Sequence, residues 1–298
     1  MKYKITHTTT YDYKSPVHVC HNLVLQTPRE DGFLRSLKHK IQVSPKPDTF
    51  NHRRDFFGNQ LVAFSVEQSH RQLVVTARSK ISLSAKPEPL VEQIPSWQQL
   101  TQAIRQQQDP RWLEASAYLY DSPRIHRDHQ FAEYAKPSFT TDRPIVEAVL
   151  DLTKRINCDF VYDPVATKVH TSPQEAFQLR RGVCQDFAHV QIACLRSLGV
   201  PVRYVSGYLR TMPPPGKPRM VGADQSHAWL SAYCGGQVGW IEFDPTNKCI
   251  CSLNHIPVAW GRDYDDVAPL RGVFLGGGQH TIKVSVDVAP YDELGVKE

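Results

Sequence analysis

Hydrophobic and polar residues alternate in short runs along the first 84 residues, a pattern typical of β-strands. Runs such as residues 2–13, 21–27 and 71–84 are rich in Val, Thr, Ile and Tyr and have turn signals between them. Three prolines within residues 86–95 then interrupt the pattern, because X-Pro steps do not extend a strand or begin a packed core. The pattern predicts an N-terminal all-β, sandwich-like domain over residues 1–88.

The next segment has a different character. Residues 97–108 and 111–120 have helical propensity, but residues 89–140 as a whole are polar and punctuated by proline. We therefore expect a partly helical connecting arm over residues 89–140.

Helical spacing becomes clear after residue 140. Asp142 is expected to cap a helix that has Pro144 in its first turn and apolar residues recurring as far as Ile156. Ser172, followed by Pro173 and by Glu175, forms a capping-box pattern that predicts a short helix over residues 173–180.

Beyond Gly182, apolar residues from Phe187 to Leu198 surround nearly the whole of a predicted helix, which is therefore expected to be buried and to end at Gly199. Strand-like runs follow at residues 200–209, 226–234 and 238–243, with residues 212–220 as a loop. Helices followed by antiparallel strands indicate an α+β core. We place this core, with a C-terminal β segment, at residues 141–298.

Cys184 stands at the predicted start of the buried helix. Unpaired N–H groups and the macrodipole at a helix N-terminus favour the thiolate, which is the nucleophilic form of cysteine. Gly182 would allow a sharp turn or a close approach of another group. A cysteine beside a buried helix is more often structural, so this position decides nothing without a base nearby.

Strand pairing supplies a candidate base. A two-residue turn at Gly235 and Gly236 would place His227 opposite Asp244, where a carboxylate can accept a hydrogen bond from the imidazole. A cross-strand polar pair at a sheet edge is the alternative interpretation, and a slip of one residue would separate the two side chains.

At this point the sequence resembles a known family. The segments RRGVCQDFAHVQIACLRSLGVPVRYVSGYL, QSHAWLSAY and GWIEFDPTN resemble the core of the bacterial transglutaminase-like family, which has a papain-like fold. HTTTYDY and GRDYDDVAPLRGVF resemble its version with an N-terminal β domain. The resemblance implies a triad with Cys184 as nucleophile, His227 as base and Asp244 as orienting acid.

The expected reaction is acyl transfer without a cofactor. Cys184 would attack an amide carbonyl of a peptide or protein substrate and form a thioester. Water would then complete hydrolysis, as in a cysteine peptidase or amidase, and this is the preferred hypothesis. The alternatives are transamidation of protein glutamine by an amine, amide formation, and a non-catalytic scaffold or adaptor. The Cys184 N–H would stabilise the oxyanion, and Gln178 is more plausibly an exposed polar residue than a second donor.

Two other clusters are weaker candidates. Cys249, Cys251 and His255 offer zinc ligands, but they lack the paired C-x2-C spacing of a structural site. The aspartates of GRDYDD lack the spacing of a calcium loop, which favours a turn with capping aspartates. No metal site is predicted.

Composition limits the possible partners and compartment. At 298 residues and 41% hydrophobic, the chain is an ordinary globular sequence, and no stretch approaches the roughly 20 apolar residues of a membrane helix. Seven unevenly spaced cysteines without an apolar leader predict free thiols in the cytoplasm. The net charge of +5 has no nucleic-acid motif around it, so neither nucleic acid nor membrane is an expected partner, and no oligomeric state is indicated.

Overall fold

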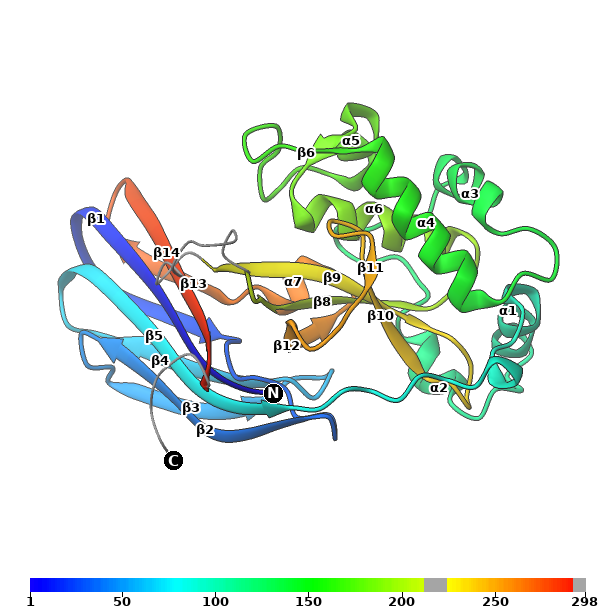
Figure 1. The fold of residues 1–298 in the computed structure, drawn as a ribbon. Helices are drawn as coiled ribbons and strands as arrows, with labels where there is room; N and C mark the ends of the chain where they lie inside the picture. The colour runs from blue at the N-terminus through cyan, green and yellow to red at the C-terminus, as the bar shows by residue number, and fades with distance from the viewer. Residues whose placement is uncertain (212–223, 292–298) are drawn as a thin grey trace, which may run out of the picture.

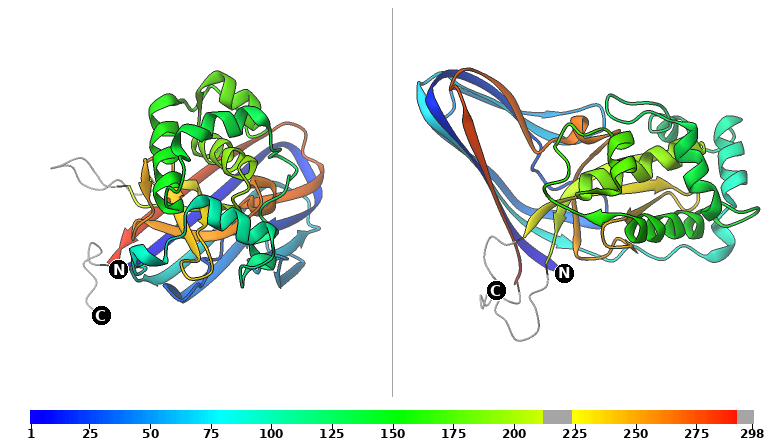
Figure 2. Two further views of the ribbon diagram at one scale, coloured as in Figure 1. Left: turned by 90° about the vertical axis from the view of Figure 1, so that its right-hand side faces the viewer. Right: turned by 90° about the horizontal axis from the view of Figure 1, so that it is seen from above.

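The computed structural model describes residues 1–211 and 224–291, and the predicted loop at residues 212–220 lies outside the described residues. A strand-rich part and a helix-rich part lie side by side (Figure 1). Seen from above, the long strands curve beside a core in which helices cover a second sheet (Figure 2). The predicted α+β class is confirmed.

Seven strands of the described chain form the first sheet, in the order β2-β5-β1-β4-β3 with β13 and β14 also paired to β1. They are β1 (Lys2–Val24), β2 (Leu34–Ser44), β3 (Thr49–Arg54), β4 (Gln60–Val66), β5 (His70–Leu83), β13 (Leu270–Gly276) and β14 (His280–Pro290). Side chains alternate between the two faces of these strands: in β1, Tyr3 and Ile5 are buried, whereas the neighbouring Lys2 and Lys4 are exposed. The predicted N-terminal β structure is confirmed.

The C-terminal strands join the N-terminal sheet. β1 is 23 residues long, and β14 pairs antiparallel with its first half while β13 pairs with its second half. Tyr13 lies where the pairing of β1 changes from β14 to β13, and its ring packs against Phe274 of β13 and His280 of β14. The two ends of the chain therefore build one sheet, although the sequence groups the C-terminal segment with the core.

The predicted arm contains short helices that pack onto the core. They are η1 (Val91–Gln93), α1 (Trp97–Arg105), α2 (Trp112–Ser116), α3 (His129–Ala135) and η2 (Lys136–Ser138). Ser96 caps α1 with a full capping box. Phe131 and Ala135 of α3 are fully buried, and α3 packs against α6 (Cys184–Ser197). These apolar positions make α3 part of the helical layer, a role that the polar composition of the segment concealed.

The core places helices on one face of an antiparallel sheet. The helices are α4 (Ile145–Asp159), α5 (Pro173–Leu179) and α6, and the sheet order is β11-β10-β9-β8-β12. The strands are β8 (Val202–Leu209), β9 (Gln225–Tyr233), β10 (Trp240–Asp244), β11 (Cys249–Ile250) and β12 (His255–Gly261). A parallel pair, β6 (Val161–Tyr162) and β7 (Arg181–Gly182), precedes α6, and α7 (Tyr264–Val267) follows β12.

Most helix boundaries agree with the sequence, with one correction. Ser172 caps α5 by accepting from the Glu175 N–H, as predicted. Asp142 does not cap α4, because its φ is 57° and Pro144 occupies the N-cap position instead. The proline fixes an extended entry into the helix, and the Ala148 N–H bonds back to the Pro144 carbonyl.

The strand-rich part and the core are joined by polar and cation–π contacts that are buried or partly buried. The Tyr3 hydroxyl donates to the Leu253 carbonyl at 3.0 Å, and His7 Nδ1 lies 3.0 Å from the Tyr208 hydroxyl. On the other side, the Arg29 guanidinium stacks 3.5 Å from the centre of the Trp260 ring. Buried polar pairs of this kind fix the orientation of packed units, so the first sheet has a defined position beside the core.

Candidate active site

Cys184 is the first residue of α6, as predicted. Its side chain is partly exposed, whereas the residues that follow it in the helix, from Gln185 to Arg196, are buried between the other helices and the sheet. α6 packs against β8 and β9, so its N-terminus is held over the strand that carries His227. The thiol is thus accessible at the rim of a rigid, buried helix.

A close approach explains the glycine before the cysteine. A Cβ atom at Gly182 would lie 2.4 Å from Asp186 Oδ2, well inside van der Waals contact. That carboxylate accepts from the Val183 N–H at 2.8 Å and from the Thr167 hydroxyl at 2.7 Å. Asp186 therefore closes the first turn of α6 and fixes the backbone on which Cys184 stands. Burial raises the pKa of Asp186, and the bonds to Thr167 and Val183 oppose that rise.

The β9–β10 connection differs from the predicted two-residue turn. It spans residues 234–239, with the Cys234 N–H bonded to the Gly239 carbonyl at 2.8 Å and positive φ angles at Gly235 and Gly239. Phe243 consequently pairs with Leu230 and not with Ala228, a register two positions from the predicted one. The predicted register is wrong, but a shift of two keeps every side chain on its predicted face.

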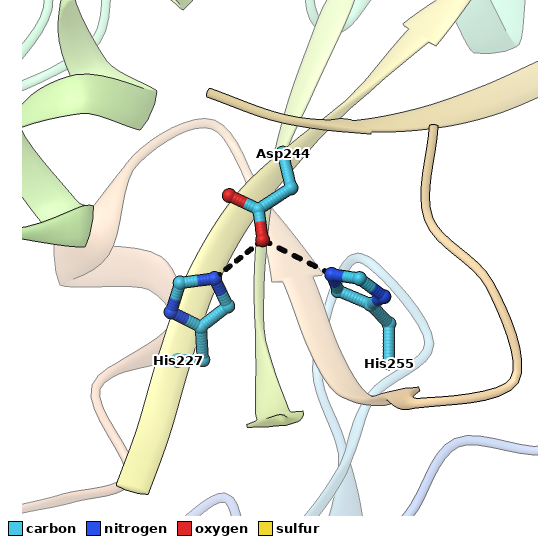
Figure 3. A group of neighbouring side chains, drawn as sticks. All are labelled: His227, Asp244 and His255. Atoms are coloured by element: carbon cyan, nitrogen blue, oxygen red, sulfur yellow. Dashed lines mark hydrogen bonds and ion pairs between the residues drawn. The ribbon is translucent and has the colours of Figure 1, made fainter. Parts of the chain in front are cut away.

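His227 and Asp244 therefore still meet. His227 Nε2 lies 2.7 Å from Asp244 Oδ2 (Figure 3), and both side chains are more than nine-tenths buried. Because Nε2 is directed at the carboxylate, Nδ1 is the ring nitrogen left to face Cys184, the thiol that acts together with Asp244 on the pKa of His227. Burial alone would lower the pKa of His227, but the hydrogen bonds to Asp244 and Cys184 outweigh burial and raise it to about 10.

Asp244 is saturated with donors. Oδ1 accepts from the backbone N–H groups of Thr246 (2.9 Å) and Asn247 (3.2 Å). Oδ2 accepts from the Asn247 side chain at 2.7 Å and from His255 Nε2 at 3.0 Å, in addition to His227. Burial opposes ionisation, yet these bonds, with His227 and His255 foremost, hold the pKa of Asp244 well below its usual range.

The sequence did not reveal His255 and Asn247 as partners of this carboxylate. Asn247 follows Asp244 within one turn, and the pattern D-P-T-N is itself a turn signal that could have indicated it. His255 was considered only as a zinc ligand with Cys249 and Cys251. In the structure its imidazole is directed at Asp244 (Figure 3), and Cys249 is the β11 partner of Asp244.

His227, Asp244 and His255 present ligand atoms within 4.8 Å of one another, so a cation is a possible alternative. The hydrogen bonding does not fit it. The Ser252 N–H donates to His255 Nδ1 at 3.2 Å, which places the ring proton on Nε2 and leaves no lone pair there for a metal. Both imidazoles aim at one carboxylate oxygen and not at a common point between the three groups. The donor set fits a hydrogen-bonded carboxylate.

Two tyrosines complete the surroundings of the thiol. Tyr204 on β8 is buried and Tyr162 on β6 is half-exposed; burial, and after it the charge of Cys184, raises the pKa of each. Cys194, ten residues along α6, is fully buried, and burial raises its pKa. The two cysteines of one helix thus have opposite environments.

The structure also shows the surroundings of Gln178, of the aspartates of GRDYDD and of Trp229, which lies on the same strand as His227. Gln178 is exposed on α5, as expected of a polar surface residue. Trp229 is fully buried, and its Nε1 donates to Glu242 Oε2 at 2.8 Å. Asp263 caps α7 by accepting from the Asp265 N–H, which confirms the capping prediction, and Arg124 pairs with Asp265 at 2.7 Å.

A helix that bears a cysteine at its N-terminus, packed on an antiparallel sheet that bears a histidine and an aspartate, defines the papain-like class of fold. Residues 3–82 match the bacterial transglutaminase-like N-terminal region, and residues 132–245 match the transglutaminase-like superfamily core. The chain belongs to the bacterial transglutaminase-like family, a family of thiol-dependent enzymes.

The chain also has relatives that match it over nearly its whole length. A protein of Mycobacterium tuberculosis is 40% identical over 295 residues, which cover 98% of this chain and 93% of the relative. A protein of Mycobacterium leprae is 33% identical over 288 residues, 96% of this chain and 97% of the relative. A crystal structure of a candidate cysteine protease from Cytophaga hutchinsonii has the same fold, with a TM-score of 0.76, 23% identity and coverage of 97% and 90% of the two chains.

Helix length bears on one further expectation. Among residues 1–211 and 224–291, no helix is both long and apolar enough to cross a membrane.

Proposed function

We propose that this protein is a cysteine peptidase or amidase that cleaves peptide or side-chain amides through a thioester on Cys184. The observation that carries the proposal is the buried pair of His227 and Asp244, 2.7 Å apart, on the sheet against which the helix that begins at Cys184 packs. Nucleophile, base and orienting acid in hydrogen-bond sequence are the elements of a cysteine triad.

In the first step the Cys184 thiolate attacks the carbonyl carbon of the amide. The C–N bond breaks, and the amine leaves with the proton held by His227, so the products are a thioester and a neutral imidazole. Asp244 supports the imidazolium before the transfer and keeps Nε2 protonated afterwards. The backbone N–H of Cys184, in the first turn of α6, is not needed for helical hydrogen bonding and is placed to stabilise the oxyanion.

In the second step neutral His227 takes a proton from water, and the hydroxide attacks the thioester carbonyl. The C–S bond breaks, the carboxylic acid leaves, and the thiolate–imidazolium pair is restored. A primary amine in place of water would give a new amide by the same proton transfers. Hydrolysis and transamidation thus share the thioester and differ in the acceptor.

One experiment tests the proposal and separates its alternatives. The purified protein is incubated with a mixture of glutamine-containing peptides, with and without a labelled primary amine, and the products are identified by mass spectrometry. Cys184→Ala is the inactive variant, and Cys194→Ala, in the buried part of the same helix, is the matched control.

We expect new chain ends or side-chain acids from the wild type and Cys194→Ala, and none from Cys184→Ala. Amine incorporation that outruns acid formation would make the protein a transamidase. Equal products from wild type and Cys184→Ala would leave the triad without function and favour the scaffold alternative.

A further inference from the structure

Asp244 has a second histidine as well as the one in the triad. His255, the first residue of β12, brings Nε2 to 3.0 Å from the same Oδ2 that accepts from His227, and the two imidazoles approach that oxygen from opposite sides (Figure 3). Its side chain is more than nine-tenths buried. Because buried polar groups need hydrogen-bond partners, each of these two side chains supplies a partner to the other.

The backbone determines which nitrogen of His255 carries the proton. The Ser252 N–H donates to Nδ1 at 3.2 Å, so Nδ1 must offer its lone pair and Nε2 must be the N–H donor. The same short loop returns the chain to β12 through the bond from the His255 N–H to the Ser252 carbonyl. The His255 ring is therefore held with Nε2 directed at Asp244.

Packing fixes the ring. Trp229 meets His255 edge to face, with ring centres 5.4 Å apart and an interplanar angle of 77°. The Trp229 ring extends over β8 because position 207 is glycine, where a Cβ would lie 2.4 Å from the indole. Trp229 is held in turn by Glu242, which pairs with Lys86 at 2.6 Å. These contacts hold the indole that packs against the His255 ring, while His255 Nε2 is directed at Asp244.

We propose that His255 is a positioning residue for the proposed reaction: its Nε2–H holds Asp244 Oδ2 in line with His227, so that the carboxylate supports the imidazolium of the Cys184 pair. The inference rests on the proposed function. Oδ1 is tied to the backbone, and Oδ2 is tied only to side chains, of which His227 is the one that must change its protonation during the reaction. His255 and the Asn247 side chain are the two fixed donors that keep Oδ2 in place while His227 changes its protonation.

A matched pair of variants separates donation from packing. Glutamine and methionine have nearly the same length, but only His255→Gln keeps an N–H donor where histidine Nε2 stands. The measurement is the rate of alkylation by iodoacetamide between pH 5 and 10, resolved for each cysteine by peptide mass mapping. Buried Cys194 reports unfolding, and exposed Cys158 reports the rate of an ordinary thiol.

We expect His255→Met to lower the rate at Cys184 at least about tenfold at pH 6, the size of a lost hydrogen bond to a charged group, and to approach the wild type near pH 10. His255→Gln should stay within about threefold of the wild type at each pH. The loss is confined to lower pH because the His227 imidazolium, which Asp244 supports, is itself lost as the pH rises through about 10.

Other outcomes overturn the proposal. A Met variant that matches the wild type, or Met and Gln variants that lose rate equally with Cys194 still protected, would show that His255 acts only through its volume. Labelling of Cys194 in the Met variant but not in the Gln variant would mean that the hydrogen bond from His255 stabilises the fold and does not act on the triad. A wild-type Cys184 no faster than Cys158 would instead refute the proposed function, whatever the variants do.

Discussion

Asp244→Asn tests the role of the buried carboxylate, because asparagine keeps the shape and loses the charge. Both oxygens of Asp244 accept: Oδ2 faces three side-chain donors and Oδ1 faces two backbone N–H groups. An amide has one acceptor oxygen, so its NH2 group must face donors in either orientation. If that group faces His227, the ring must turn its lone pair to it and present a proton to Cys184.

The expected loss of activity in Asp244→Asn follows from the pKa of His227. Hydrogen bonds to Asp244 and Cys184 together raise that pKa from 6.5 to about 10. Each pKa unit of that rise that is lost with Asp244 lowers the stability of the imidazolium about tenfold. The wrong tautomer adds to this, and the equivalent change in a serine triad lowers kcat about 10⁴-fold. We therefore expect kcat/KM at neutral pH to fall at least about 100-fold.

The assay is the cleavage rate of the peptide that the wild type hydrolyses fastest, with thermal denaturation as the check on folding. Asp12→Asn, in the distant β1, is the matched control and should retain wild-type activity. A folded Asp244→Asn variant within about tenfold of the wild type would refute the idea that the carboxylate supports His227.

Three further predictions concern the helix that carries the nucleophile, its neighbour and the base. Gly182→Ala places a Cβ 2.4 Å from Asp186 Oδ2 and should lower the free energy of unfolding by about 1–3 kcal/mol in urea titrations; an unchanged midpoint would contradict this. Ser172→Ala removes the cap of α5 and should cost about 0.5–2 kcal/mol while leaving the labelling rate of Cys184 unchanged. Because the pKa of His227 is raised to about 10, its imidazolium is fully present below pH 6.5 and is lost as the pH rises through 10, so peptide cleavage should decline there and not near pH 6.5.

Local patterns were sufficient to predict much of the site. The apolar run after Cys184 predicts a buried helix, and because the run starts just after the cysteine it also places Cys184 at the start of that helix. His227 and Asp244 could be placed on one face because side chains in a strand repeat every two residues, so even a register wrong by two preserved their meeting. The error came from the turn: Gly239, and not Gly236, has the second positive φ of a six-residue connection.

Contacts between distant segments could not be predicted in this way. His255 lies in a segment without periodicity, and β9 and β8 stand between its strand β12 and the strand β10 of Asp244 in the sheet order, so no local pattern indicates their contact. The pairing of β14 with β1 joins residues more than 250 positions apart, and no local pattern distinguishes it from a strand added to the core. Such contacts depend on how whole layers pack.

Competitive labelling of the seven cysteines tests whether His227 activates Cys184. Limiting iodoacetamide at pH 7, followed by peptide mass mapping, gives the rate of Cys184 relative to exposed Cys158 in the wild type and in His227→Ala. We predict a wild-type ratio of at least about 10, because a neighbouring base that accepts the thiol proton activates a cysteine nucleophile, and a ratio near 1 in the variant. A wild-type ratio near 1, or a high ratio that survives the loss of His227, would show that His227 does not activate Cys184.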